Sequence, residues 1–353
     1  MRMAVSIEHP AWAHQFRYVI QQLRAEGNSV LALAVEKDGD TELLRDFGID
    51  YQLMERSTGK NVPEKCWLFL KLCVTYSLAI RKNRVELLFG RASPMMAVAA
   101  FLCHIPHVVF EDTEVSKFSL LFCRLFSSCI ITPEPFLTDL GKKQQRLPIY
   151  KELFYLGRGY FQPDPELLRG FGMDPDEPYM IARFVSWDAS HDVGKKGLSD
   201  KEKADFVKRL SAFARVYVSS EGALPPALET YRLPTPYQQI HQALYFASLV
   251  VSEGASMASE AAVLGTHALY LNEIESGTTN EQEKRFGLLT VLHNPHTRYA
   301  QALSEAEKLL ADSDLRAKGK RKREALLNAM SDANQAFIQA LKERMSNGFP
   351  MEK

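Results

Sequence analysis

Short apolar runs alternate along the chain with longer segments in which apolar residues recur every three or four positions. The short runs predict β-strands, and the longer segments predict amphipathic helices. Strands separated by helices are typical of a parallel, doubly wound sheet. In the first part of the chain we expect strands over 3–7, 30–35, 51–54, 85–89, 107–110 and 129–132, and helices over 12–26, 64–82, 94–103 and 115–127.

The alternation weakens between 133 and 178, where prolines are frequent, and then resumes. Here we expect strands over 179–184, 215–219, 249–252 and 267–271, and helices over 200–213, 237–246, 256–264 and from 297 onward. We therefore predict an α/β protein with two Rossmann-like domains whose parallel sheets face each other across a cleft. The predicted domains are residues 1–165 and 166–330, and a helix over 331–353 could pack back across both.

Composition narrows the class of protein. The 43 Lys and Arg residues balance the 43 Asp and Glu residues, so the net charge does not favour nucleic acid as a partner. Five cysteines are scattered through apolar segments without a C-x-x-C pair, which indicates buried thiols in a reducing compartment and no metal site. The N-terminus does not read as a signal peptide, and the longest apolar stretch, 67–80, is too short to span a bilayer. We therefore expect a cytoplasmic protein.

The most informative segment runs from an apolar strand through the turn Gly254–Ala255–Ser256 into a helix that contains Met257 and Glu260. The first N–H groups of a helix have no partner within it, and together with the helix dipole they favour a phosphate. The small residues allow close approach, and Glu260 could accept hydrogen bonds from ribose hydroxyls. An equally simple interpretation is a capped core helix with a solvated Glu260.

Other polar residues follow predicted strands and are candidates for contacts with a nucleotide or a sugar. Two cations could compensate a diphosphate, Arg183 and Lys195, and a weaker candidate, Glu221, follows a later strand. The loop that carries Lys195 also contains Trp187, His191 and Asp192, although it could be an ordinary surface loop. Thr279 lies in a polar loop after a further strand.

In the first predicted domain, histidines and acids follow strands. His9 and His14 come after the first strand, and a histidine can accept a proton from an attacking hydroxyl. Either could instead be structural. Glu111, Asp112 and Glu114 end another strand, and clustered acids raise one another's pKa, which suits acid or base catalysis. They could also bind acceptor hydroxyls or cap the next helix.

The run S-E-A-A-V-L-G-T over 259–266 resembles the nucleotide-sugar site of GT-B glycosyltransferases and of the related non-hydrolysing UDP-GlcNAc 2-epimerases. The whole chain is similar to a family of predicted glycosyltransferases long catalogued as a domain of unknown function. The matching motifs include I-E-H-P-A-W-A-H-Q-F over 7–16, F-E-D-T-E over 110–114, R-F-V-S-W-D-A-S-H-D-V-G over 183–194 and M-A-S-E-A-A-V-L-G-T over 257–266.

The resemblance implies a glycosyltransferase that moves a sugar from a nucleotide donor, UDP-linked, to a cell-surface glycan or a lipid-linked acceptor. Gly254, Ala255 and Ser256 would contact the donor diphosphate, Glu260 would contact the ribose, and His14 would be the base. Met257 would also belong to the donor site. The turn departs from the family pattern because Glu253 would repel phosphate unless it is paired or turned away. No cofactor or metal is required. A non-hydrolysing 2-epimerase and a non-catalytic nucleotide-sugar-binding protein stay open.

Two segments, 65–84 and 117–124, mix large apolar residues with cations. They could touch the inner face of a membrane where a lipid-linked acceptor is held, or they could simply be helices packed on the sheet. The basic run K-G-K-R-K-R over 318–323 is typical of a solvated helix face.

Overall fold

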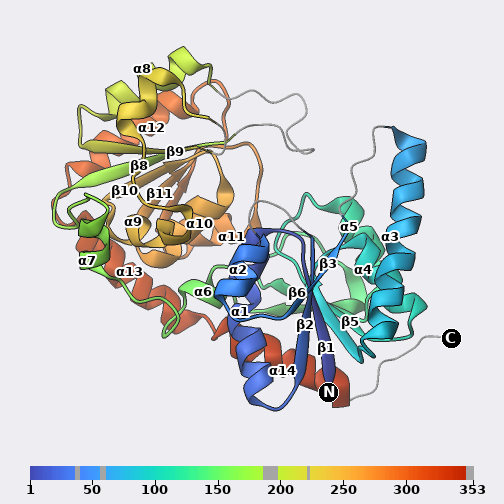
Figure 1. Cartoon of the computed structure of the whole chain (residues 1–353). Coiled ribbons are helices and arrows are strands. Elements are labelled where there is room, and N and C mark those ends of the chain that lie inside the picture. The colour runs from blue at the N-terminus through green and yellow to red at the C-terminus, as the bar shows by residue number, and fades with distance from the viewer. Residues whose placement is uncertain (36–39, 56–60, 186–197, 221–222, 347–353) are drawn as a thin grey trace. The chain divides into compact units, whose positions relative to one another are not determined.

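The computed structural model describes residues 1–35, 40–55, 61–185, 198–220 and 223–346. The chain forms two compact units (Figure 1). The first unit contains Met1–Tyr155 together with Ser331–Lys353, and the second unit contains Leu156–Met330. The division therefore falls ten residues before the predicted boundary at 165, and the last helix belongs to the first unit.

The first unit is built on a seven-stranded sheet with the order β3-β2-β1-β4-β5-β6-β7, and every pair of neighbouring strands is parallel. The strands are β1 (Arg2–Ile7), β2 (Ser29–Val35), β3 (Tyr51–Met54), β4 (Leu87–Arg91), β5 (His107–Phe110), β6 (Cys129–Pro133) and β7 (Gln144–Leu147). Figure 1 shows helices on both faces of this sheet. They are α1 (Pro10–Ala25), α2 (Asp40–Asp46), α3 (Val62–Lys82), α4 (Pro94–Leu102), α5 (Lys117–Phe126), α6 (Leu153–Leu156) and α14 (Ala333–Ser346).

The C-terminal helix α14 completes the core of the first unit. Its Phe337 is fully buried, and its ring lies 5.7 Å from that of Phe16 on α1 and 5.7 Å from that of Phe154. The ring of Phe89 on β4 lies 6.1 Å away. Such aromatic contacts bury large apolar areas, so the helix is an integral part of this unit.

The second unit contains a five-stranded parallel sheet with the order β12-β11-β10-β8-β9. Its strands are β8 (Tyr179–Phe184), β9 (Arg215–Ser220), β10 (Leu249–Ser252), β11 (His267–Tyr270) and β12 (Leu289–Val291). Its α-helices are α7 (Pro165–Gly170), α8 (Asp200–Leu210), α9 (Ile240–Phe246), α10 (Ala255–Leu264), α11 (Gly277–Lys284), α12 (Arg298–Leu310) and α13 (Leu315–Ala329). The strands and helices form an apolar core that includes Leu210, Val251 and Leu269.

Both sheets are doubly wound, so each has a point where the strand order reverses. In the first unit this point lies between β1 and β4, and in the second between β8 and β10. Ligands of open α/β sheets bind outside the carboxyl ends of the strands at such a point. The residues that follow these four strands are therefore the first to consider for a site.

The basic run over 318–323 is only partly a solvated face. Gly319 is buried against Gly265, which ends α10 in a left-handed conformation with φ 85°. Arg323 Nε donates to the carbonyl of Val263 at 3.1 Å, and Lys322 Nζ donates to that of Gly287 at 2.6 Å. Lys318, Lys320 and Arg321 are exposed. Arg323 therefore supplies a donor to the C-terminal end of α10, and Lys322 supplies one to the loop after α11.

None of the described helices combines the length and the apolar character that a membrane span needs.

Candidate functional site

The turn between β10 and α10 is fixed by its own side chains. Ser252 Oγ accepts the N–H of Gly254 at 3.1 Å and donates to the carbonyl of the same residue at 2.8 Å. Gly254 is the N-terminal cap of α10, and a Cβ there would lie 3.3 Å from Val185 Cγ1. The turn is therefore tight, and it directs the first N–H groups of α10 toward the end of the sheet.

The residues of this turn differ in exposure. Ser256 is exposed, and Gly254 and Ala255 are half-buried. Met257 is buried, so its side chain belongs to the core. At this end of α10, an anion could be bound by the backbone N–H groups of the turn and by the Ser256 side chain.

Glu253 is buried and hydrogen-bonded on both carboxylate oxygens. Its side chain is buried, with Oε2 accepting the N–H of Val185 at 3.0 Å and Oε1 accepting the hydroxyl of Tyr299 at 2.6 Å. Burial, and then the charge of Glu253, raise the pKa of Tyr299, which keeps this hydroxyl protonated as a donor. Glu253 therefore joins the end of β8 and helix α12 to the turn.

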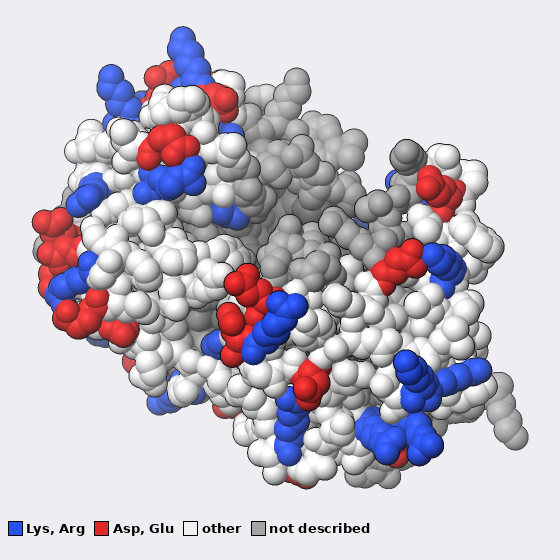
Figure 2. Space-filling view, viewed as in Figure 1, with Lys and Arg blue, Asp and Glu red and all other residues white. Residues whose placement is uncertain are grey.

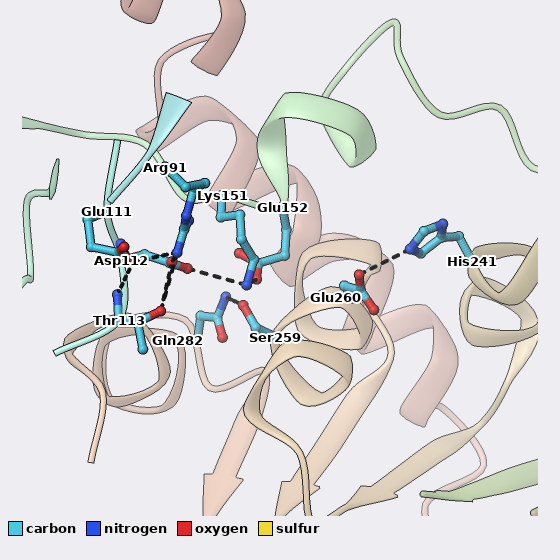
Figure 3. Close-up of polar contacts among 10 residues, drawn as sticks. All are labelled: Arg91, Glu111, Asp112, Thr113, Lys151, Glu152, His241, Ser259, Glu260 and Gln282. Atoms are coloured by element: carbon cyan, nitrogen blue, oxygen red, sulfur yellow. Dashed lines mark hydrogen bonds and ion pairs between the residues drawn. The ribbon is translucent and has the colours of Figure 1, made fainter. Parts of the chain in front are cut away.

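Glu260 lies in the second turn of α10 and points toward His241 on α9 (Figure 3). Glu260 Oε1 and His241 Nε2 are 3.2 Å apart, and each side chain is 15% exposed. The preceding residue, Ser259, accepts a hydrogen bond at 2.8 Å from Gln282 on α11, which fixes the rotation of α10. Glu260 is thus oriented by a neighbouring helix and still reaches solvent.

The other residues predicted to contact the donor lie outside the turn and α10. Arg183 is the last residue but one of β8 and lies in register with Ser252, and its Nη1 donates to Ser219 Oγ on β9 at 2.9 Å. Thr279 is buried, and its hydroxyl donates to the carbonyl of Ser276 at 3.0 Å, so it stabilises the start of α11. Five of the predicted contacts lie outside the described residues: Trp187, His191, Asp192, Lys195 and Glu221.

In the first unit, the two acids directly after β5, Glu111 and Asp112, belong to a largely buried ionic network (Figure 3). Arg91, the last residue of β4, donates to Glu111 and lies 2.5 Å from Asp112 Oδ1. Lys151 Nζ is 3.4 Å from Asp112 Oδ2 and 3.4 Å from Glu152 Oε1. Glu111 Oε1 also accepts the backbone N–H groups of Asp112 and Thr113, each at 2.9 Å.

This network moves the pKa values of the two acids apart. Burial raises the pKa of Glu111 despite Arg91, and the charge of Asp112 raises it further. Burial opposes ionisation of Asp112 as well, but Arg91 and Lys151 outweigh it and hold its pKa well below the usual range. The pKa shifts of these acids therefore depend on burial and on Arg91 and Lys151 as well as on the mutual repulsion of the two carboxylates. Glu114 lies apart from these contacts, with Oε1 accepting the N–H of Leu137 at 3.4 Å.

The two histidines after β1 have different surroundings. His9 caps α1, with Nδ1 accepting the N–H of Ala11 at 3.2 Å. His14 is half-buried on α1, where its ring meets that of Phe47 edge-on at 5.4 Å and lies 6.2 Å from that of Tyr155. Because the Nδ1 atom of His9 accepts a hydrogen bond, the proton of its neutral ring lies on Nε2.

Some residues that contact the predicted site residues were not themselves predicted from the sequence. His241 lies 19 positions before Glu260, and only the packing of two helices brings them together. Arg91 has a signal in the sequence, because a cation at the end of an apolar strand usually needs a buried partner. Among the described residues, no group of three or more His, Cys, Asp or Glu side chains could hold a metal ion.

Neither protein-family models nor curated protein sequences give a match to this chain. Solved structures do. The UDP-GlcNAc 2-epimerase of Neisseria meningitidis, bound to UDP-GlcNAc, aligns over 98% of this chain and 100% of its own, with a TM-score of 0.69 and 10% identity.

Two further structures are similar over nearly the whole chain. MurG of Acinetobacter baumannii aligns over 97% of this chain and 100% of its own, with a TM-score of 0.59 and 14% identity. The glycosyltransferase VinC in complex with dTDP aligns over 99% of this chain and 100% of its own, with a TM-score of 0.62 and 13% identity. The chain therefore has the GT-B type of fold, with two Rossmann-like parallel sheets.

Proposed function

We propose that the protein is a glycosyltransferase that moves a sugar from a nucleotide donor, UDP-linked, to a hydroxyl of a cell-surface glycan or a lipid-linked acceptor. The observation that carries this proposal is the second unit's turn over Gly254–Ser256 with Glu260 beside it. The tight turn, the N-terminus of α10 and the oriented carboxylate of Glu260 follow strand β10. This is the end of the sheet at which doubly wound sheets bind their ligands. Similar folds that bind UDP-GlcNAc and dTDP support a nucleotide-sugar ligand.

In this proposal the diphosphate rests on the backbone N–H groups at the start of α10, where Gly254 leaves room for it. Glu260 accepts hydrogen bonds from the ribose hydroxyls, and His241 holds the carboxylate in place. Arg183 and Lys195 are the cations proposed for the diphosphate. Helix-end amides and cations can stabilise a departing diphosphate without a metal or another cofactor.

On the acceptor side we assign the base to His14. The acceptor oxygen bonds to the anomeric carbon, the hydroxyl proton passes to His14, and the bond to the nucleotide diphosphate breaks with its electron pair on the leaving oxygen. His9 is the weaker candidate because its Nδ1 atom already accepts a hydrogen bond. Glu111 and Asp112 are both ion-paired with Arg91, which makes them weaker candidates for the base that 2-epimerisation needs at the sugar's C2.

The test is to incubate the purified protein with UDP-sugars, with and without glycan and lipid-linked acceptors. We expect acceptor-dependent release of UDP. A C2 epimer without release would instead establish an epimerase, and binding without either product would establish a nucleotide-sugar-binding protein. Absence of UDP binding would contradict all three.

Two variants separate the proposed roles. His14→Ala should lower turnover by about 10²- to 10⁴-fold and leave UDP affinity unchanged, because it removes only the base. Glu260→Ala should weaken UDP binding by roughly ten- to a hundredfold, since hydrogen bonds to a charged group are lost. Glu166→Ala, on an exposed side chain of α7, is the control.

A further inference from the structure

The first unit contains a cavity of about 860 Å³ with mainly apolar walls. Phe69 and Leu72 of α3 line it on one side, and Phe118 and Phe122 of α5 on another. The rings of Phe69 and Phe122 meet at 5.3 Å. This volume is in the range of sites that bind small molecules.

One end of the cavity is polar. Glu8, the first residue after β1, lines it together with Tyr76 of α3. Burial raises the pKa of Glu8 against a hydrogen bond with Ser93 that lowers it, and burial together with the charge of Glu8 raises the pKa of Tyr76. Among the described residues, Glu8 Oε1 is buried without a hydrogen-bond partner. A buried polar atom of this kind is costly unless a ligand or water completes it.

The other end of the cavity is surrounded by exposed apolar side chains. Val62, Leu70 and Phe118 line the cavity and are 72%, 59% and 63% exposed. None of the residues before Leu72 on α3 is buried, although this half of the helix includes Trp67. Large apolar side chains gathered on a surface mark a place where an apolar partner binds.

A few charged side chains interrupt this apolar surface. In Figure 2 the part of the molecule over α3 carries some acidic and basic side chains among uncharged ones, and Lys and Arg side chains gather near its lower end. Glu55 and Lys65 line the cavity beside the apolar residues, and Glu55 Oε2 lies 2.7 Å from Lys71 Nζ. The rim of the cavity is therefore mainly apolar, with Glu55 held in an ion pair.

We propose that this cavity binds the apolar chain of an amphiphilic acceptor and places its hydroxylated head at Glu8. This inference rests on the proposed function, because it names the class of acceptor. A peptide would bring backbone N–H and C=O groups that the apolar walls cannot satisfy. A free sugar would leave most of its hydroxyls unpaired, whereas a single hydroxylated head requires only the groups at the polar end.

The cavity carries a natural reporter. Cys66 lines it and is exposed. Burial raises the pKa of Cys73 to about 11 and that of Cys123 to about 12, and it also raises the pKa of the buried Cys129, so these thiols react slowly. Cys103 is half-buried, and its Sγ donates to the carbonyl of Ser77 at 3.4 Å. An alkylating reagent should therefore modify the exposed Cys66 first, which mass spectrometry of peptides can follow.

The experiment compares dodecyl β-glucoside, below its micelle concentration, with methyl β-glucoside. We expect the dodecyl compound to slow alkylation of Cys66 by about tenfold or more and the methyl compound to have no effect, because each buried CH₂ group adds to binding. Equal rates with both compounds would overturn the proposal.

A matched pair of variants provides the control. Leu70 and Leu78 lie on the same helix with 59% and 60% exposure, and of the two only Leu70 lines the cavity. Leu70→Asp should weaken binding of the dodecyl compound by about tenfold or more, and Leu78→Asp should not. Equal binding by both variants would count against the cavity.

This test is independent of sugar transfer. Protection of Cys66 without any UDP release from UDP-sugars would support the cavity and contradict the transferase. UDP release that is equally fast with the methyl and dodecyl acceptors, without protection, would support the transferase and contradict the cavity.

Discussion

Two histidines, the buried His107 and the partly buried His267, make the stability of both units depend on pH. His107 in the first unit is fully buried, with Nδ1 3.0 Å from Ser127 Oγ, and burial lowers its pKa to about 3. In the second unit, burial and then the charge of Lys322 lower the pKa of His267 to about 4. Both side chains are therefore neutral in the folded protein where an unfolded histidine would be charged.

Below pH 6.5 the unfolded chain binds a proton at each histidine and the folded chain does not. The free energy of unfolding therefore decreases as the pH is lowered, down to about pH 4 for His267 and about pH 3 for His107. Denaturant unfolding between pH 7 and 5 should show this loss. His107→Gln should reduce the slope by up to about 1.4 kcal/mol per pH unit, and an unchanged slope would show that His107 does not titrate on unfolding.

At the proposed donor site, His241 has a positioning role that can be separated from that of Glu260. His241→Phe removes the partner at 3.2 Å and leaves the carboxylate free to rotate. We expect UDP affinity to fall several-fold, less than in Glu260→Ala, because the carboxylate that contacts the ribose is still present and loses only the partner that orients it. Calorimetric titration with UDP measures both. A loss larger than that of Glu260→Ala would mean that His241 contacts the nucleotide itself.

At the scale of elements, the contact between α10 and α13 depends on glycine. A Cβ at Gly319 would lie 2.0 Å from the carbonyl oxygen of Gly265, so the two helices approach too closely for any side chain. Gly319→Ala should destabilise the second unit by about 1–3 kcal/mol through overpacking, a fall in melting temperature of about 2–4 °C per kcal/mol.

The control for this substitution is Gly170→Ala at the end of α7, where an added Cβ meets nothing within 4 Å. Replacing glycine by alanine there should be neutral or stabilising by a few tenths of a kcal/mol. Equal effects of the two substitutions would contradict the close helix contact.

Helices α3 and α5 expose large apolar side chains next to lysines, which suggests a contact with a membrane surface. We propose that the exposed Trp67, Phe118 and Leu121, with the neighbouring Lys65 and Lys117, contact an anionic bilayer. The protein should co-sediment with phosphatidylglycerol vesicles, less so at high salt, and Phe118→Ser with Leu121→Ser should reduce this binding. Leu137→Ser, at another exposed position, is the control. Equal sedimentation of all variants would contradict the contact.

The regular elements show which parts of the fold a sequence can predict. Strands such as β6 and β10 are buried along their length and mainly apolar, as is β1 after its first residue, so their runs are visible in the sequence. Edge strand β7 has the sequence Gln-Gln-Arg-Leu, and β12 has only three residues. These strands are defined by their pairing with one neighbour, which a local pattern does not contain.

At the scale of the whole molecule, the division of the chain and the candidate site were predicted unevenly. The position of α14 depends on Phe337 meeting rings from α1, β4 and α6, which no local pattern reveals. The turn over Gly254–Ser256 could be predicted from its small residues after an apolar strand. The pairing of Glu253 with Tyr299, 46 residues later, could not.

The central claim is that the second unit binds the nucleotide diphosphate at the start of α10. The most direct test is a crystal structure of the protein soaked with UDP. We predict density for the diphosphate against the N–H groups of the Gly254–Ser256 turn, with the ribose hydroxyls at Glu260. Two results would contradict the account. One is a nucleotide bound at another place in a crystal whose packing leaves the start of α10 open, and the other is a start of α10 that is covered by the protein itself.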